Sequence, residues 1–106
     1  VRFLPNPHFV ADLRPLTGLD KRVIDYLSGH PEVEETITRF VDMLAFLLPR
    51  FKREAKSYVT IGVGCTGGRH RSVMVAEALH KRLAELGYPS RVVHRDIEKD
   101  EQRYQI

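Results

Sequence analysis

The sequence lacks several features that mark particular classes of protein, and each absence excludes one class. Cys65 is its one cysteine among 106 residues, which excludes a disulfide framework and favours a reducing compartment such as the cytoplasm. It has no apolar run of bilayer-spanning length, so we expect no membrane-spanning helix. It also has no Gly-x-x-x-x-Gly-Lys-Ser/Thr stretch, so the P-loop pattern that cradles nucleotide phosphates is absent from these residues.

The bulk composition is that of an ordinary globular domain. Apolar residues make up 42% of the chain and charged residues 29%. At this length, roughly two-thirds of the unfolded surface can be buried on folding, so we expect residues 1–106 to form one domain. The net charge of +3 permits an acidic partner such as RNA but does not demand one.

Three segments have helical spacing. Asp20 is placed to cap a short helix that ends near Gly29. Pro31 suits the first turn of a long helix with an apolar stripe from Val33 to Phe51, within which we expect Pro49 to cause a bend or break. A third helix is predicted over residues 72–86, with Gly87 just after its C-terminus.

Three shorter segments, residues 2–4, 58–63 and 91–94, are predicted to be strands. The order strand, helix, helix, strand, helix, strand predicts a small three-layer α/β domain with a mostly parallel sheet. Residues 58–63, apolar or small, would form its central strand, covered on both faces. Ligands bind at the carboxyl ends of such strands, so we expect residues 5–8, 65–72 and 94–96 to share one rim.

The segment Cys65-Thr66-Gly67-Gly68-Arg69-His70-Arg71-Ser72 lies between the predicted central strand and the third helix. A helix N-terminus presents free main-chain N–H groups and the positive end of its dipole, which together suit an anion. Arg69 and Arg71 add donors whose geometry fits phosphate. The loop therefore predicts a ligand that carries phosphate.

One interpretation makes this loop catalytic. Cys65, Gly68, Arg71 and Ser72 match the cysteine-phosphatase pattern Cys-x-x-Gly-x-x-Arg-Ser, in which a thiolate attacks phosphorus. The positive end of a helix and neighbouring arginines would stabilise such a thiolate. However, the leaving group needs a general acid, and Asp12 and Asp96 are the only loop carboxyls to consider. Gly64 also stands where most such phosphatases have histidine.

The other interpretation is a site that binds a phosphorylated metabolite without turning it over. It needs only the loop's donors, with Cys65 as a small wall residue. His8 and Asn6, which follow the first predicted strand, would read hydroxyl or amine groups of the ligand. The candidate binding residues are therefore Asn6, His8, Cys65, Thr66, Gly67, Gly68, Arg69, His70, Arg71 and Ser72.

Three stretches, RFLPNPH at residues 2–8, RPLTGLD at 14–20 and GCTGGRHRSV at 64–73, closely resemble the C-terminal domain of the RapZ/YvcJ family of bacterial P-loop nucleotide-binding proteins. The resemblance covers essentially the whole chain, and the ten-residue stretch is more specific than the phosphatase pattern. It implies that an N-terminal P-loop domain of the family is absent from this sequence. Any weak ATPase or GTPase activity would belong to that missing domain, with no catalysis and no resident cofactor or metal here.

The resemblance also implies a function in sensing amino-sugar metabolism. Family members bind glucosamine-6-phosphate or sense UDP-N-acetylglucosamine, and some bind small regulatory RNA and present it to an endoribonuclease. Cys65, Thr66, Gly67, Gly68, His70 and Arg71 match the family's phosphosugar loop, and His8 matches its PNPH histidine; Arg69 replaces the usual lysine. A homo-oligomer is implied as well. Basic residues that would follow an RNA backbone are Arg50, Lys52, Arg53, Lys56, Lys81 and Arg82.

Overall fold

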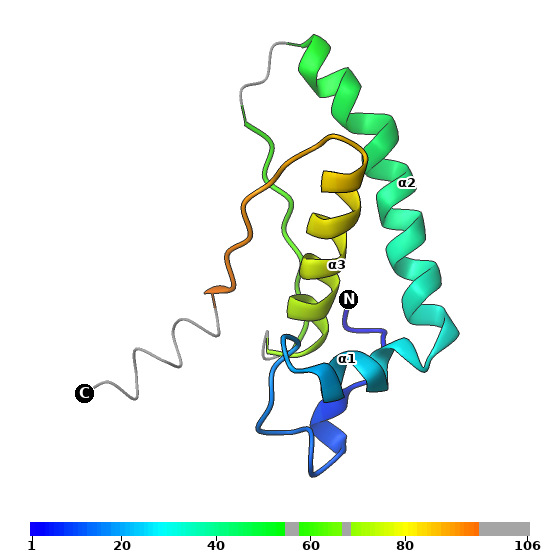
Figure 1. The fold of residues 1–106 in the computed structure, drawn as a ribbon, viewed down its shortest axis with the longest axis vertical. Helices are drawn as coiled ribbons and strands as arrows, with labels where there is room; N and C mark the ends of the chain where they lie inside the picture. The colour runs from blue at the N-terminus through cyan, green and yellow to red at the C-terminus, as the bar shows by residue number, and fades with distance from the viewer. Residues whose placement is uncertain (55–57, 67–68, 96–106) are drawn as a thin grey trace, which may run out of the picture.

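The computed structural model describes residues 1–54, 58–66 and 69–95 (Figure 1). Its elements, in chain order, are the 3-10 turn η1 (Pro7–Phe9) and the helices α1 (Lys21–Ser28), α2 (Pro31–Arg53) and α3 (Arg71–Glu85). Helix α2 runs along one side of the molecule with α3 beside it, while α1 lies across their lower ends in the view of Figure 1. Among the described residues, no helix has the length and hydropathy that a bilayer crossing requires.

The first two helices begin where their sequence signals place them. The Asp20 carboxylate accepts a hydrogen bond from the Arg22 main-chain N–H at 2.9 Å, which caps α1 as predicted. Helix α2 starts at Pro31 with Glu32 and Glu34 in its first turn, where carboxylates complement the helix dipole. It continues through Pro49 as far as Arg53, so Pro49 does not break the helix, and the bend expected as the alternative stays a prediction.

Helix α3 ends in a left-handed glycine. Gly87 has φ of 91°, the region that glycine adopts without steric cost. The Tyr88 N–H donates to Leu83 O at 2.8 Å and the Gly87 N–H donates to Ala84 O at 3.0 Å. These two bonds form a Schellman motif, which confirms the predicted position of Gly87 after the helix.

The core lies where the apolar stripes of the three helices meet. It is built from Val23 and Leu27 of α1, Val33, Ile37 and Leu44 of α2, and Val75, Leu79 and Leu83 of α3, together with Leu4 and Leu13 from the N-terminal segment. On the surface, the Arg82 guanidinium of α3 contacts the Glu34 carboxylate and donates to Thr38 Oγ1 at 3.2 Å. Burial of the apolar stripes therefore positions α3, whose N-terminus carries the candidate loop.

The predicted three-layer α/β architecture is wrong: the described residues contain helices and no strand. Residues 2–4 lie in a turn, in which the Leu4 N–H donates to Val1 O at 3.3 Å. Residues 58–64 and 88–94 are free of assigned secondary structure. An apolar run can be extended without a partner, but a strand requires another chain segment beside it. Tyr58 is 92% exposed and Val59 and Ile61 about two-fifths exposed, so this segment is not the buried centre of a sheet.

Candidate functional site

The N-terminus of α3 lies against the thiol of Cys65. The Ser72 main-chain N–H, in the first turn of α3, donates to Cys65 Sγ at 3.4 Å. His70, at the N-cap position, makes no capping bond with its side chain. Sulfur therefore serves as an acceptor at a helix start where a Ser or Asp oxygen is more usual. Cys65 is half-buried, which agrees with a wall residue beside the helix start.

Arg71 faces inward, against the N-terminal segment. Its side chain is almost fully buried, and Nη1 donates to Arg2 O at 2.5 Å and to Leu4 O at 3.1 Å. A buried guanidinium needs such acceptors, because leaving it unpaired away from water is costly. Arg71 thus fastens residues 2–4 to the start of α3. In the phosphatase pattern the equivalent arginine must point toward the substrate, so this contact favours a positioning role.

His70 is the second buried polar anchor. Its Nε2 lies 3.2 Å from Leu13 O, and since a carbonyl only accepts, Nε2 carries the proton. Burial lowers the pKa of His70 from its ordinary value of 6.5. The nearby main-chain carbonyls raise this pKa and the charge of Arg69 lowers it further, but each has a smaller effect than burial. The ring is therefore held neutral and donates one fixed hydrogen bond. It joins the loop to the segment that carries RPLTGLD.

The loop before α3 and residues 14–20 also contact each other through their main chains, at Gly18. The Gly18 N–H donates to Arg69 O at 2.8 Å, and Arg69 Nη2 donates to Pro15 O at 3.3 Å. A Cβ atom on residue 18 would lie 2.3 Å from His70 O and 2.6 Å from Met74 N. Only glycine permits this approach, so residues 14–20 form one wall of the site.

Arg2 is a member of the site that the sequence did not single out. Its Nε donates to Thr66 Oγ1 at 3.1 Å, and both residues are exposed. Arg14 is also exposed and its Nε donates to His8 O at 2.8 Å. Both arginines occur in the stretches that carry the family resemblance, which is the signal that would have found them.

The remaining predicted site residues are placed less centrally. Asn6 accepts from the His8 main-chain N–H at 3.1 Å and so caps η1, while the His8 ring is exposed beside Phe9. Gly67 and Gly68 lie outside the described residues. His94, expected at the same rim, instead lies 2.7 Å from the Glu77 carboxylate on the side of α3.

Positive charge accumulates around the start of α3. Arg2, Arg14 and Arg71 donate to main-chain carbonyls or to a hydroxyl, which are neutral acceptors. Such bonds orient a guanidinium without neutralising its charge. The positive end of the α3 dipole points to the same place. This arrangement suits an anion, and Thr66 with the exposed arginines supplies donors at its surface.

The predicted RNA-contact residues divide into two groups. Arg50, Lys52 and Arg53 are exposed at the C-terminal end of α2, and Lys81 is exposed on α3. Arg82 is half-buried and bonded to Glu34 and Thr38, and Lys56 lies outside the described residues. In Figure 1 the C-terminal end of α2 lies at the top of the view and the start of α3 lies near the bottom, so the exposed cations at the end of α2 belong to another surface.

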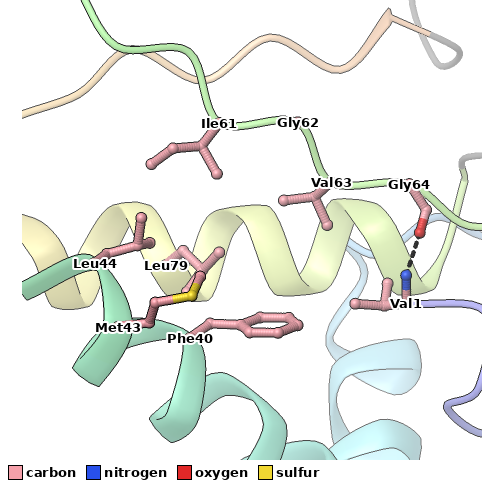
Figure 2. Close-up of a pocket in the computed structure, with 9 residues that line it drawn as sticks. All are labelled: Val1, Phe40, Met43, Leu44, Ile61, Gly62, Val63, Gly64 and Leu79. Atoms are coloured by element: carbon pink, nitrogen blue, oxygen red, sulfur yellow. Dashed lines mark hydrogen bonds between the residues drawn. The ribbon is translucent and has the colours of Figure 1, made fainter. Parts of the chain in front are cut away.

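Figure 2 shows a hollow between α2, α3 and the segment at residues 61–64. It is lined by Val1, Phe40, Met43, Leu44, Ile61, Gly62, Val63, Gly64 and Leu79. The terminal ammonium of Val1 contacts Gly64 O at its edge. Apolar side chains offer no donors to a phosphate, so the hollow and the anion site are separate features.

Comparison with known proteins decides the family. Residues 1–98 match the model described as the RapZ C-terminal domain. The chain belongs to the RapZ C-terminal domain family. It is 54% identical over 99 residues to a nucleotide-binding protein of Koribacter versatilis, covering 93% of this chain and 32% of that protein. It is equally similar to one of Geobacter sulfurreducens, covering 93% of this chain and 35% of that protein.

A nucleotide-binding protein of Anaeromyxobacter dehalogenans is 53% identical over 100 residues, covering 94% of this chain and 34% of the relative. The chain thus spans about a third of the length of these relatives. The RapZ C-terminal domain is therefore one part of larger proteins that are named nucleotide-binding proteins.

Proposed function

We propose that this RapZ-type C-terminal domain is a regulatory domain that binds a phosphorylated amino sugar at the start of α3. Glucosamine-6-phosphate and UDP-N-acetylglucosamine, the two ligands implied by the resemblance, share a hexosamine and at least one phosphate. The phosphate would lie at the positive end of the α3 dipole, where Thr66, Arg69 and Arg2 would donate to it. His8 and Asn6 would approach the sugar, and Cys65 would line the wall without reacting.

The observation that carries this proposal is the set of arginines bonded to neutral acceptors at a helix N-terminus. Arg2 and Arg71, far apart in the sequence, keep their positive charge where α3 begins, and Arg14 adds a further charge on the N-terminal segment beside His8. The buried hydrogen bond of His70 and the close approach at Gly18 fix the position of residues 13–18 against the start of α3. A positively charged surface whose groups are already held by hydrogen bonds needs little reorganisation to accept phosphate, which favours binding.

We also propose that, in a longer nucleotide-binding protein, occupancy of this site is communicated to an RNA or protein partner. Ligand contacts that bridge residues 2–20 and the start of α3 would change how firmly the two are held together. The relatives are named nucleotide-binding proteins, and we assign nucleotide binding to residues outside this chain.

Titration calorimetry tests the binding. We expect heat with glucosamine-6-phosphate or UDP-N-acetylglucosamine, and none with glucosamine at the same concentration, because the phosphate supplies the charge-assisted bonds. Arg2→Gln together with Thr66→Val removes two exposed groups and should weaken binding about tenfold or more. Lys21→Gln, an exposed cation on α1, is the matched control and should leave affinity unchanged. No heat with either ligand at millimolar concentration would overturn the proposal.

The cysteine-phosphatase alternative is separated by a different readout. Binding alone predicts no hydrolysis of a generic aryl phosphate. Hydrolysis that is lost in Cys65→Ser would instead assign a nucleophile to the loop and displace the binding proposal. Far-UV circular dichroism of Cys65→Ser checks that α3 still begins correctly without the sulfur acceptor.

A further inference from the structure

The first four residues form a tight turn near the start of α3. The Leu4 N–H donates to Val1 O at 3.3 Å, which closes a β-turn with Arg2 and Phe3 at its two central positions. Leu4 is buried and belongs to the core, whereas Arg2 and Phe3 are exposed. The tip of the turn therefore presents one cationic and one aromatic side chain to solvent. In Figure 1 the N-terminal end of the chain lies beside the lower part of α3.

Arg71 holds this turn in place. Its buried guanidinium donates from Nη1 to Arg2 O at 2.5 Å and to Leu4 O at 3.1 Å, the carbonyls on either side of Phe3. The main chain of Phe3 is thus fixed at both ends, while 67% of the residue remains exposed. A group that is already fixed loses less conformational entropy when a ligand contacts it. The Phe3 ring is therefore attached to a preorganised part of the chain.

Phe3 lies beside the groups that we propose to hold phosphate. Arg2, its neighbour in the turn, donates from Nε to Thr66 Oγ1 at 3.1 Å. Phe9 is also exposed, but the hydrogen bonds that it and its two neighbours make lie within residues 6–14. Phe3 is therefore the exposed aromatic residue whose neighbours are bonded both to the start of α3 and to Thr66.

An arginine and an aromatic ring on one turn suit a ligand in which a flat ring is joined to phosphate. Guanidinium groups bind phosphate, and nucleobases stack on aromatic side chains because both have a π-face. A hexosamine ring is not flat and carries hydroxyl groups around its edge, so it gains less from Phe3. Of the two ligands considered above, only UDP-N-acetylglucosamine has a base that could stack in this way.

We propose that Phe3 is a specificity-determining residue, which stacks on the uracil base of a nucleotide-linked amino sugar. The assignment rests on the proposed function, because Arg2, Thr66 and the positive end of the α3 dipole must hold the diphosphate. UDP-N-acetylglucosamine is then the preferred ligand, and glucosamine-6-phosphate binds through its phosphate and sugar alone. The base contact accounts for about a tenfold difference in Kd. This ligand is separate from the nucleotide whose binding we place outside this chain.

A tryptophan at position 3 reports directly on the stack. The sequence contains no tryptophan, so Phe3→Trp introduces a unique fluorophore that keeps an aromatic ring at this position. We expect uridine diphosphate and UDP-N-acetylglucosamine to quench its fluorescence saturably, because the base covers the indole, and glucosamine-6-phosphate to leave it unchanged. Phe46→Trp replaces a half-exposed aromatic residue of α2 and is the matched control, which should respond to none of these ligands.

Calorimetry with Phe3→Leu provides the second measurement. This variant should raise the Kd for UDP-N-acetylglucosamine about tenfold and leave the Kd for glucosamine-6-phosphate unchanged, whereas Phe46→Leu should change neither. Circular dichroism checks that both variants fold as the wild type does.

The outcomes separate this role of Phe3 from the proposed function. A wild-type chain that binds neither ligand overturns both. A chain that binds glucosamine-6-phosphate at least as tightly as UDP-N-acetylglucosamine, or a Phe3→Leu variant that weakens both ligands equally, overturns the stacking role alone. Quenching of the Phe3→Trp variant by glucosamine-6-phosphate would place the ring against the sugar and would overturn that role as well.

Discussion

At the scale of single residues, Gly18 has the closest neighbours of any glycine in the described part of the chain. A Cβ there would meet main-chain atoms of His70 and Met74 that lie within the start of α3 and cannot yield as a flexible side chain would. We expect Gly18→Ala to lower the free energy of unfolding by about 1–3 kcal/mol. Gly62→Ala is the matched control, since nothing lies within 4 Å of its Cβ position. Urea unfolding of both variants measures the difference, and equal midpoints would contradict the close approach.

His70 makes stability depend on pH. Burial lowers its pKa below 6.5 in the folded chain, so the unfolded chain binds this proton more readily. The unfolding free energy should therefore be constant above about pH 7.5 and decrease as the pH falls through 6.5 toward the lower folded pKa.

Unfolding measured between pH 8 and 5 should show a slope of at most about 1.4 kcal/mol per pH unit from this residue. His70→Gln keeps a donor for Leu13 O but does not titrate, so its stability should change less with pH over the same interval. An identical pH dependence in the variant would mean that His70 is not held neutral by the fold.

The candidate site was partly visible in the sequence and partly hidden. The pattern from Cys65 to Ser72 marks a helix start, and the structure brings Cys65 and Thr66 to that start as the spacing suggests. The inward direction of Arg71 was not predictable, because the acceptors at Arg2 and Leu4 lie nearly seventy residues away in sequence. Long-range contacts of this kind depend on how the helices pack, which local pattern does not encode.

At the scale of elements, the helices were predictable because their signals are local. Asp20, Pro31 and Gly87 mark ends that the structure reproduces within about a residue. The strands were not, because pairing is a tertiary property. An alternating or continuous apolar run predicts burial on an extended chain, yet residues 58–64 are extended, partly exposed and outside any assigned strand.

The cap of α1 gives a prediction at this scale. Asp20→Ala removes the acceptor for the Arg22 N–H and should lower the unfolding free energy by about 0.5–2 kcal/mol. Asp20→Asn keeps an oxygen in place and should cost less. Thermal unfolding followed by circular dichroism at 222 nm compares them, and a wild-type midpoint for Asp20→Ala would contradict the capping role.

At the scale of the whole molecule, the three helices act as a frame that holds two distant segments together. Packing of α2 on α3 fixes where α3 begins, and the contacts of His70, Arg71 and Gly18 attach residues 2–20 to that point.

The central claim is that phosphate binds at the start of α3. Titration of the ¹⁵N-labelled chain with glucosamine-6-phosphate, followed by amide NMR spectra, tests this most directly. We predict that the amides of Thr66, Arg69 and Ser72 shift together and saturably, while those of Phe46 and Arg50 on α2 do not move. Saturable shifts confined to α2 or to the apolar hollow, or no shifts at millimolar ligand, would contradict the account.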